Sequence, residues 1–335
     1  MAVILHLLLA FSSVAIIWFL SGILIEATDR VAKRYHQSGF SVAFFILGFL
    51  TSISEASVAV NATIQGVPQV SAGNLIGASL VIFLLIIPVL AITANGITMR
   101  LGLTRKNLRL LLFVVLLPAL LVLDGAVSRN EGLIMLLVYA SLIYAVQKKR
   151  GKVKSTGNTA EEDFVTRKHA TAADMVKILI GGVLIFVAGK ILVDEAIYFS
   201  AILRVPPSFI GLLVLSIGTN VPELAIALRC VFGRHTSIAF GDYMGSAAAN
   251  TLILGLLSLA NGEFILERSE FISTFLLLTI GLVLFSVFAQ SKSILSRREG
   301  LVLLSLYVFF LISQLVNVSQ IIPTVQGAAS LARIL

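Results

Sequence analysis

Three acidic side chains stand inside otherwise apolar stretches of this sequence. Of its 17 acidic residues, Glu55, Glu223 and Asp242 lie at or near the middle of apolar segments, and the others lie in polar stretches or near segment ends. An unpaired carboxylate in such surroundings is costly. Because no Lys or Arg occupies the central turns of the same segments, a captured cation or a proton is the expected counter-charge.

Hydroxyl and amide side chains accompany these acids. Hard cations prefer oxygen ligands, and calcium takes about 6–8 of them, while sodium could use a subset of the same oxygens. The absence of Cys and His from these segments argues against zinc or copper. The alternative is a structural polar cluster that hydrogen-bonds between helices. We predict a cation site formed by Glu55, Glu223, Asp242, Asn74, Thr51, Ser52, Thr219 and Asn220.

The segments that carry these residues are long and apolar. With 58% hydrophobic and 13% charged residues, the 335-residue chain lacks the charge of a soluble protein, in which about a quarter of the residues are charged. Apolar stretches of about 20 residues match a helix that crosses a membrane. We predict an all-α polytopic membrane protein with ten spans: 1–26, 41–66, 70–98, 109–127, 131–147, 173–199, 207–229, 236–260, 271–290 and 300–320.

The distribution of basic residues indicates the topology. Every second loop between the predicted spans is rich in basic residues. Together these loops hold 20 of the 25 Lys and Arg residues, with Lys177 counted in the third of them. This bias predicts a protein of the cell membrane (plasma or inner membrane), with these loops in the cytoplasm and both termini outside. The polar stretch 148–172 is interpreted as a flexible cytoplasmic linker. A regulatory ion-binding loop is the alternative there, but its acids lack EF-hand spacing. The net charge of +8 therefore reflects topology and does not indicate a nucleic-acid partner.

The two halves of the chain, 1–147 and 173–335, contain a repeat. An offset of 168 residues aligns Thr51–Glu55 with Thr219–Glu223, and the same offset aligns Gly73–Gly77 with Gly241–Gly245 without a gap. Because each half has five predicted spans, an odd number, the halves must enter the membrane in opposite orientations. Two inverted five-helix repeats with a site at their interface are a recurring plan of secondary transporters. Pro222 and Gly218 further predict a helix break beside Glu223.

The paired segments resemble the two α-repeats of the cation/calcium exchanger superfamily. TSISE and TNVPE are similar to its GTSLPE motif, and GNLIGAS and GDYMGSA are similar to its GN/D-x-x-GSN motif. The resemblance implies that Glu55 and Glu223 ligate calcium and sodium, that the Thr, Ser and Asn residues before them contribute oxygens, and that Asn74 and Asp242 complete the centre. Leu50, Ser54 and Asn220 depart from the family pattern, which leaves the coupling ion open among sodium, potassium and protons.

These observations lead to the hypothesis of an alternating-access antiporter that exports calcium in exchange for sodium. Calcium and a monovalent coupling cation are its substrates, the lipid bilayer is its surroundings, and we expect no cofactor. A calcium (or other cation)/proton antiporter, a cation channel and a non-transporting scaffold are the alternatives. An enzyme is not expected, because no nucleophile–base pair or metal motif is evident. The sequence does not determine the oligomeric state.

The predicted topology can be tested by accessibility labelling. In intact cells, an impermeant amine reagent should leave the lysines of 148–168 unlabelled, and these lysines should react once the membrane is opened. Labelling of this stretch in intact cells would place the linker outside and reverse the topology.

Overall fold

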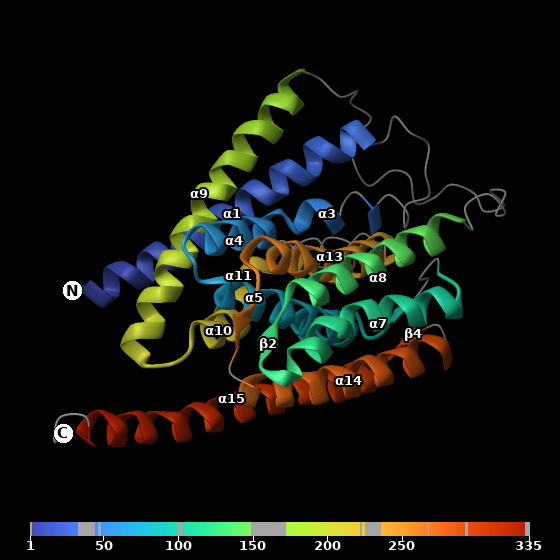
Figure 1. Cartoon of the computed structure of the whole chain (residues 1–335). Coiled ribbons are helices and arrows are strands. Elements are labelled where there is room, and N and C mark those ends of the chain that lie inside the picture. Colours follow the sequence, from blue (N-terminus) through green and yellow to red (C-terminus); the bar gives the residue numbers. More distant parts are fainter. Residues whose placement is uncertain are drawn as a thin grey trace.

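The structure is a computed structural model that describes residues 2–32, 44–45, 48–98, 103–148, 172–221, 223–224, 236–266, 268–291 and 294–331. Helices dominate it (Figure 1). Most of the predicted linker, 149–171, lies outside the described residues. The first half contains α1 (Ala2–Ala32), α3 (Gly48–Thr51), α4 (Ile53–Ile64), α5 (Pro68–Val81), the π-helical η3 (Ile82–Ile86), α6 (Ile87–Thr93), α7 (Arg105–Leu121), the 3-10 turn η4 (Val122–Asp124) and α8 (Arg129–Lys148). The second half contains α9 (Ala172–Leu203), α10 (Pro207–Ile210), the π-helical η6 (Gly211–Leu215), α11 (Ser216–Thr219), α13 (Thr236–Asn261), α14 (Arg268–Ser291) and α15 (Arg297–Leu331).

Seven helical stretches in the described part are long and apolar enough to cross a membrane, and Pro207–Thr219 is a shorter apolar helix. This confirms a polytopic helical membrane protein. Where both ends are described, the helices begin and end within several residues of the predicted spans, apart from α15, which continues to Leu331. Parts of the predicted spans 41–66 and 207–229 lie outside the described residues. The seven stretches are Val3–Leu20, Pro68–Thr93, Arg105–Asp124, Arg129–Gln147, Phe240–Asn261, Phe271–Gln290 and Arg297–Val316.

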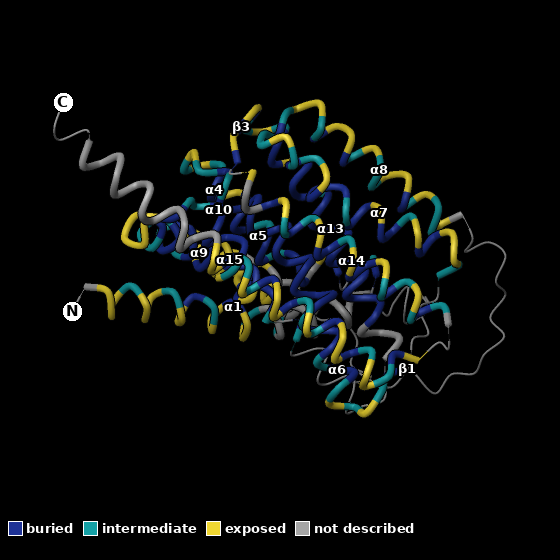
Figure 2. Tube along the Cα trace, turned by 90° about the horizontal axis from the view of Figure 1, so that it is seen from below, coloured by how far each residue is buried: buried dark blue, intermediate teal, exposed yellow. Residues whose placement is uncertain are grey.

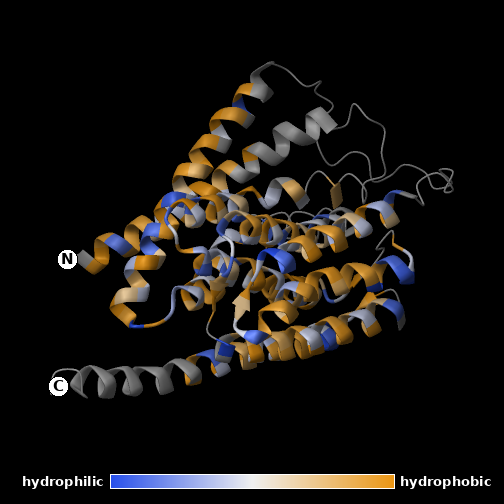
Figure 3. Ribbon diagram, viewed as in Figure 1, coloured by the Kyte–Doolittle hydropathy of each residue, from blue (hydrophilic) through white to orange (hydrophobic). Residues whose placement is uncertain are grey.

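The helices form a buried centre with an apolar periphery. Of the apolar windows, 83% of Pro68–Thr93 and 78% of Phe240–Asn261 are buried, against 11% of Val3–Leu20. Figure 2 shows this contrast between the dark α5 and α13 and the yellow edge of α1. Figure 3 shows that hydrophobic residues predominate along peripheral helices such as α9 and α14, as lipid contact requires. The polar residues of interest therefore lie on the central elements.

Two helical stretches are interrupted at equivalent places. In the first half, α3 ends at Thr51 and α4 begins at Ile53, with Ser52 at φ −74° and ψ 5° between them. In the second half, α11 ends at Thr219, and Asn220 follows at φ −89° and ψ 7°. Residues 52 and 220 are related by the repeat offset of 168, as are α3 and α11. The break expected beside Glu223 is therefore present in both halves.

Short strand pairs and helix caps repeat in the same way. β1 (Ile97–Thr98) pairs antiparallel with β4 (Ile294–Leu295), and β2 (Ala126–Val127) pairs with β3 (Phe264–Ile265), so each half supplies one strand to each pair. The helices α8 and α15 each begin with a capping box, in which Ser128 bonds with Glu131 and Ser296 bonds with Glu299. These two boxes are again 168 residues apart.

Glycines allow the two halves to approach at backbone distance. A Cβ atom on Gly77 would lie 2.3 Å from the Leu212 carbonyl oxygen, and one on Gly245 would lie 2.2 Å from the Phe44 carbonyl oxygen. Gly77 and Gly245 are offset equivalents, as are Phe44 and Leu212. Reciprocal contacts of this kind arise when two similar units pack about a two-fold axis. Side chains larger than hydrogen would separate the central helices.

Replacing Gly245 with Ala should therefore destabilise the protein. The new methyl group would overlap a backbone atom, and overpacking of this kind costs about 1–3 kcal/mol. Thermal unfolding in detergent measures the effect. Leu256→Ala is the control, because Leu256 lies on the same helix with 52% of its surface exposed. Equal melting temperatures for the two variants would contradict the close approach.

Candidate cation site

The first interruption places Glu55 in the first turn of α4. A helix N-terminus carries partial positive charge from its free N–H groups, which favours a carboxylate there. Glu55 is fully buried, as are Thr51 and, to within 1%, Ser52. The chain therefore directs an acid and two hydroxyls into the protein interior where α3 ends and α4 begins.

The second interruption places Glu223 in the equivalent position. Glu223 and Thr219 are fully buried, and Asn220 is 1% exposed. The Asn220 side-chain amide donates to the Ser216 carbonyl oxygen at 2.7 Å, which leaves its own Oδ1 without a hydrogen-bond partner. Asn74 on α5 and Asp242 on α13 are also fully buried, so all eight predicted site residues lie in the interior.

Each of the three acids accepts a hydrogen bond from a hydroxyl group through one carboxylate oxygen. Ser54 Oγ donates to Glu55 Oε2 at 2.8 Å, and Ser246 Oγ donates to Glu223 Oε1 at 3.1 Å. Thr51 Oγ1 donates to Asp242 Oδ1 at 3.1 Å. The carboxylates are thereby oriented by neutral donors, and their charge is not cancelled.

The second oxygen of each acid has no hydrogen-bond partner. Glu55 Oε1, Glu223 Oε2 and Asp242 Oδ2 are buried and unpaired. Leaving a buried charged oxygen unpaired costs at least about 1–3 kcal/mol. Neither of the two ion pairs seen among the described residues, His6–Glu195 and Lys190–Asp194, includes any of these acids. Three vacant oxygen ligands therefore face the protein interior.

Bonds between the halves assemble the cluster. Thr51 Oγ1 donates to Asp242, and its offset equivalent Thr219 Oγ1 donates to Asn74 Oδ1 at 3.2 Å. Each bond joins a helix break of one half to the buried helix of the other. Ser52 Oγ also donates to Ser246 Oγ at 3.2 Å, again between the halves. The candidate site thus lies where the two halves of the chain meet.

The charges of the cluster interact with one another. Glu55 and Asp242 both lie close enough to Glu223 to repel its negative charge. Among the described residues, however, no three His, Cys, Asp or Glu side chains converge closely enough to enclose a metal ion by themselves. A cation bound here would therefore need hydroxyl, amide or backbone oxygens in addition to carboxylates. The threonine, serine and asparagine side chains are positioned to provide such oxygens.

The structure adds residues that sequence reasoning did not place in the site. Ser54 contacts Glu55, and its hydroxyl also lies 3.3 Å from the Thr219 carbonyl oxygen of the other half. Ser246 connects Ser52 to Glu223. Ser54 stood out in the sequence only as a departure from the family proline. Ser246 lies four residues after Asp242, which puts both side chains on one face of a helix. This spacing could have indicated Ser246 as a site residue.

Two further buried asparagines, Asn61 and Asn250, make bonds between helices. Asn61 Nδ2 on α4 donates to the Phe186 carbonyl oxygen of α9 at 3.1 Å. Asn250 Nδ2 on α13 lies 3.4 Å from Ser79 Oγ on α5, and its Oδ1 has no hydrogen-bond partner. Asn61 therefore joins helices, whereas Asn250 also presents a vacant buried oxygen.

Comparison with known protein families identifies the family of this chain. The profile of the family described as sodium/calcium exchanger protein matches residues 5–147 and 175–316, that is, both halves without the linker. The chain belongs to this family. The exchanger-family assignment confirms the resemblance carried by the paired motifs, and it makes the chain a member of a transporter family.

Individual relatives agree with the assignment. The sodium/calcium exchanger MaX1 of Methanosarcina acetivorans is 25% identical over 324 residues, which covers 86% of this chain and 92% of the relative. An uncharacterised membrane protein of Methanocaldococcus jannaschii is 25% identical over 296 residues, covering 88% of this chain and 92% of that protein. A solved structure of the sodium-calcium exchanger NCX_Mj, soaked with sodium and strontium ions, has the same fold, with a TM-score of 0.66 at 22% identity over 93% of this chain and 99% of that chain.

The reciprocal threonine bonds allow a quantitative test of the site's charge. In the absence of cations, a double-mutant cycle of Thr51→Val with Asp242→Ala should give a larger coupling energy than Thr219→Val with Asn74→Ala, because each alanine removes the acceptor of one threonine bond. Hydrogen bonds to charged groups contribute about 1.5–3 kcal/mol and neutral ones about 0.5–1.5 kcal/mol. Thermal unfolding of the purified protein supplies the four free energies of each cycle. Equal coupling energies would show that Asp242 carries no charge in the empty site.

Proposed function

We propose that this protein is a secondary active antiporter that exchanges calcium for sodium at the site between its halves. The observation that carries the proposal is the set of three buried carboxylate oxygens without a hydrogen-bond donor, on Glu55, Glu223 and Asp242. Such oxygens are tolerable in a membrane protein when a cation or a proton neutralises them. Asn74, Thr51, Ser52, Thr219 and Asn220 complete the proposed ligand set.

The donor chemistry favours calcium and sodium as the ions. All proposed ligands are oxygens, and two or three carboxylates with neutral oxygens can provide about 6–8 contacts to calcium. Sodium would occupy subsets of the same oxygens. The names of the relatives point the same way, since MaX1 and NCX_Mj are both sodium/calcium exchangers. Competition of two ions for one carboxylate cluster would couple their fluxes.

We infer ten membrane spans in two inverted five-helix repeats, residues 1–147 and 173–335, joined by a cytoplasmic linker, 148–172. Equivalent contacts in the two halves support this arrangement. The Thr51–Asp242 bond corresponds to the Thr219–Asn74 bond, and the close contact at Gly77 corresponds to the one at Gly245. Both termini would lie outside. In this arrangement the peripheral α1 and α9 rock against the central helices and open the site to one side at a time.

Polar contacts join the peripheral helix α9 to α4, the helix that carries Glu55. Ser57 Oγ on α4 lies 3.2 Å from the Ile185 carbonyl oxygen of α9, and Asn61 donates to the next carbonyl oxygen on α9, that of Phe186. A Cβ atom on Gly189 of α9 would lie 2.1 Å from Ser57 Oγ, so the two helices touch closely. Since α4 also carries Glu55, motion of α9 would be transmitted to the ion site.

The membrane potential sets the expected direction. If each cycle moves more positive charge inward than outward, a negative interior drives calcium out, because one charge crossing 100 mV is worth about 2.3 kcal/mol. Occlusion of an empty site would be disfavoured, because Glu55, Glu223 and Asp242 repel one another when no ion neutralises them. Movement of the site across the membrane would therefore require a bound ion.

A calcium (or other cation)/proton antiporter is the second candidate. The observation that favours it is the hydroxyl contact to each acid: Ser54 and Ser246 could donate to an ionised carboxylate or accept from a protonated one. Isotopic calcium uptake into proteoliposomes, driven separately by sodium, potassium and proton gradients, distinguishes the two functions.

Glu223→Gln should abolish exchange. The substitution removes one of the charges that hold the ion, so calcium uptake under a sodium gradient should fall to the level of empty liposomes. Calcium should also stabilise the wild type by about 2.7 kcal/mol at 100 times its dissociation constant, and this shift should vanish in the variant. Glu299→Gln, which keeps a capping side chain outside the site, is the matched control and should transport normally.

Other outcomes would identify the remaining candidates. A channel would pass calcium current without an opposing gradient, and a scaffold would show neither uptake nor a calcium-dependent melting shift. Normal exchange by Glu223→Gln would remove the proposed site from the transport mechanism.

A further inference from the structure

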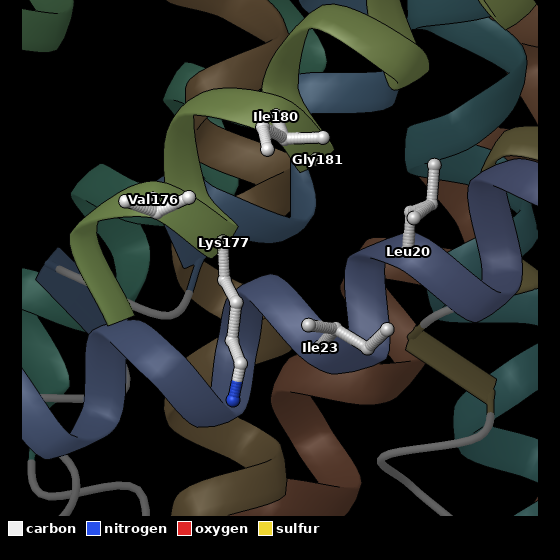
Figure 4. A pocket seen from close by; sticks show the side chains of 6 residues that line it. All are labelled: Leu20, Ile23, Val176, Lys177, Ile180 and Gly181. Carbon is white, nitrogen blue, oxygen red and sulfur yellow. The ribbon is translucent and has the colours of Figure 1, made fainter. Parts of the chain in front are cut away.

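A hollow lies between α1 and α9, and none of the residues that line it belongs to the candidate ion site. Its volume is about 180 Å³, and it is lined by Leu20, Ile23, Val176, Lys177, Ile180 and Gly181. Figure 4 shows the two α1 side chains facing the α9 residues across it. All the lining residues except Lys177 are apolar. An apolar hollow on the outer surface of a membrane protein is filled by hydrocarbon in preference to water.

Gly181 makes the hollow and Lys177 stands at its edge. The two residues are four apart on α9, so they share one face of the helix. Gly181 has no side chain to fill the space beside α1, and one helical turn away Lys177 offers an ammonium group. Lys177 is exposed, and no hydrogen bond or ion pair engages it in the described structure. The hollow therefore combines an apolar space beside Gly181 with the positive charge of Lys177 at its edge.

The position of Lys177 along α9 sets the depth of this cation. Lys177 lies five residues into α9, which corresponds to about 7.5 Å along the helix axis. A lysine so close to the end of a membrane helix extends its ammonium group to the level of the lipid phosphates. By the predicted topology this end of α9 is cytoplasmic, where anionic lipids attract basic residues.

The flanking sequence reinforces the positive charge. The stretches that lead out of α1 and into α9, residues 26–34 and 167–177, hold six basic residues and three acidic ones, a net charge of +3. The basic residues are Arg30, Lys33, Arg34, Arg167, Lys168 and Lys177, and the acidic ones are Glu26, Asp29 and Asp174. The complementary ligand has a negative headgroup and a long apolar chain.

We propose that this hollow binds an anionic phospholipid of the cytoplasmic leaflet, with an acyl chain between α1 and α9 beside Gly181 and its phosphate on Lys177. The site is independent of the ions that the protein transports. Under the proposed function α1 and α9 rock together against the central helices, so a lipid bound between them would move with this pair.

Native mass spectrometry of the full-length protein in detergent tests the proposal. Phosphatidylglycerol and phosphatidylcholine with identical acyl chains are added in equal amounts, and the retained lipid is counted. The wild type should retain phosphatidylglycerol about fivefold more strongly, the factor that one lysine near a membrane surface supplies. Lys177→Gln should remove this preference and Lys177→Arg should restore it.

Two further variants separate the hollow from general surface charge. Lys190→Gln is the matched control, because Lys190 is an exposed lysine on the same helix that pairs with Asp194 at 2.9 Å, away from the hollow. It should keep the wild-type preference. Gly181→Leu fills the hollow and should lower retention of both lipids at an unchanged melting temperature.

Three results would overturn the proposal. The first is equal retention of the two lipids by the wild type. The second is an equal loss of preference in Lys177→Gln and Lys190→Gln. The third is a wild-type protein that forms dimers, shows no lipid preference and loses the dimers in Gly181→Leu. This result would make the face a contact between two copies of the chain.

Discussion

The structure depends on acidic oxygens that the protein leaves without donors in its own interior. Glu55, Glu223 and Asp242 are fully buried, yet each offers one oxygen to which no protein group donates. A fold that needed these acids only to hold helices together would supply a donor for both oxygens. Serine and threonine hydroxyls orient one oxygen of each acid and leave the other vacant. The protein alone therefore leaves the site incomplete, and a positive ion would complete it.

The helix breaks and the close glycines follow from this constraint. Oxygens from both halves can face one another only if the central helices approach at backbone distance, which Gly77 and Gly245 permit. The breaks at Ser52 and Asn220 lie three residues before Glu55 and Glu223, whose side chains are fully buried. Backbone interrupted at membrane depth is tolerated where it lies inside protein, as it does here.

The sequence predicted much of this arrangement, because burying charge in a membrane is costly enough to be visible in composition alone. The eight proposed ligands all lie in the interior, and the repeat offset relates their contacts. Pro222 and Gly218 predicted the second break, but the first half has Ser54 in place of the proline and breaks at Ser52 all the same. At that break Thr51 and Ser52 donate to Asp242 and Ser246 of the other half. Ser54 and Ser246 escaped prediction because a serine in an apolar helix usually bonds to its own backbone, and only the assembled interface shows a carboxylate beside it.

The repeated scaffold carries an unequal distribution of charge. Thr51 and Thr219 make equivalent bonds, but the acceptor is an ionisable Asp242 in one and a neutral Asn74 in the other. Likewise Ser246 holds Glu223, whereas its offset equivalent is Ala78, and Glu55 is held by the adjacent Ser54. The second half thus contributes two acids and the first half one. Since the threonine bonds are equivalent and the charge is not, a divalent ion would be drawn towards the Glu223 and Asp242 side of the interface. The neutral oxygens of Asn74 and Thr219 then suit a monovalent ion, so one two-fold frame can hold unlike ions in unlike positions.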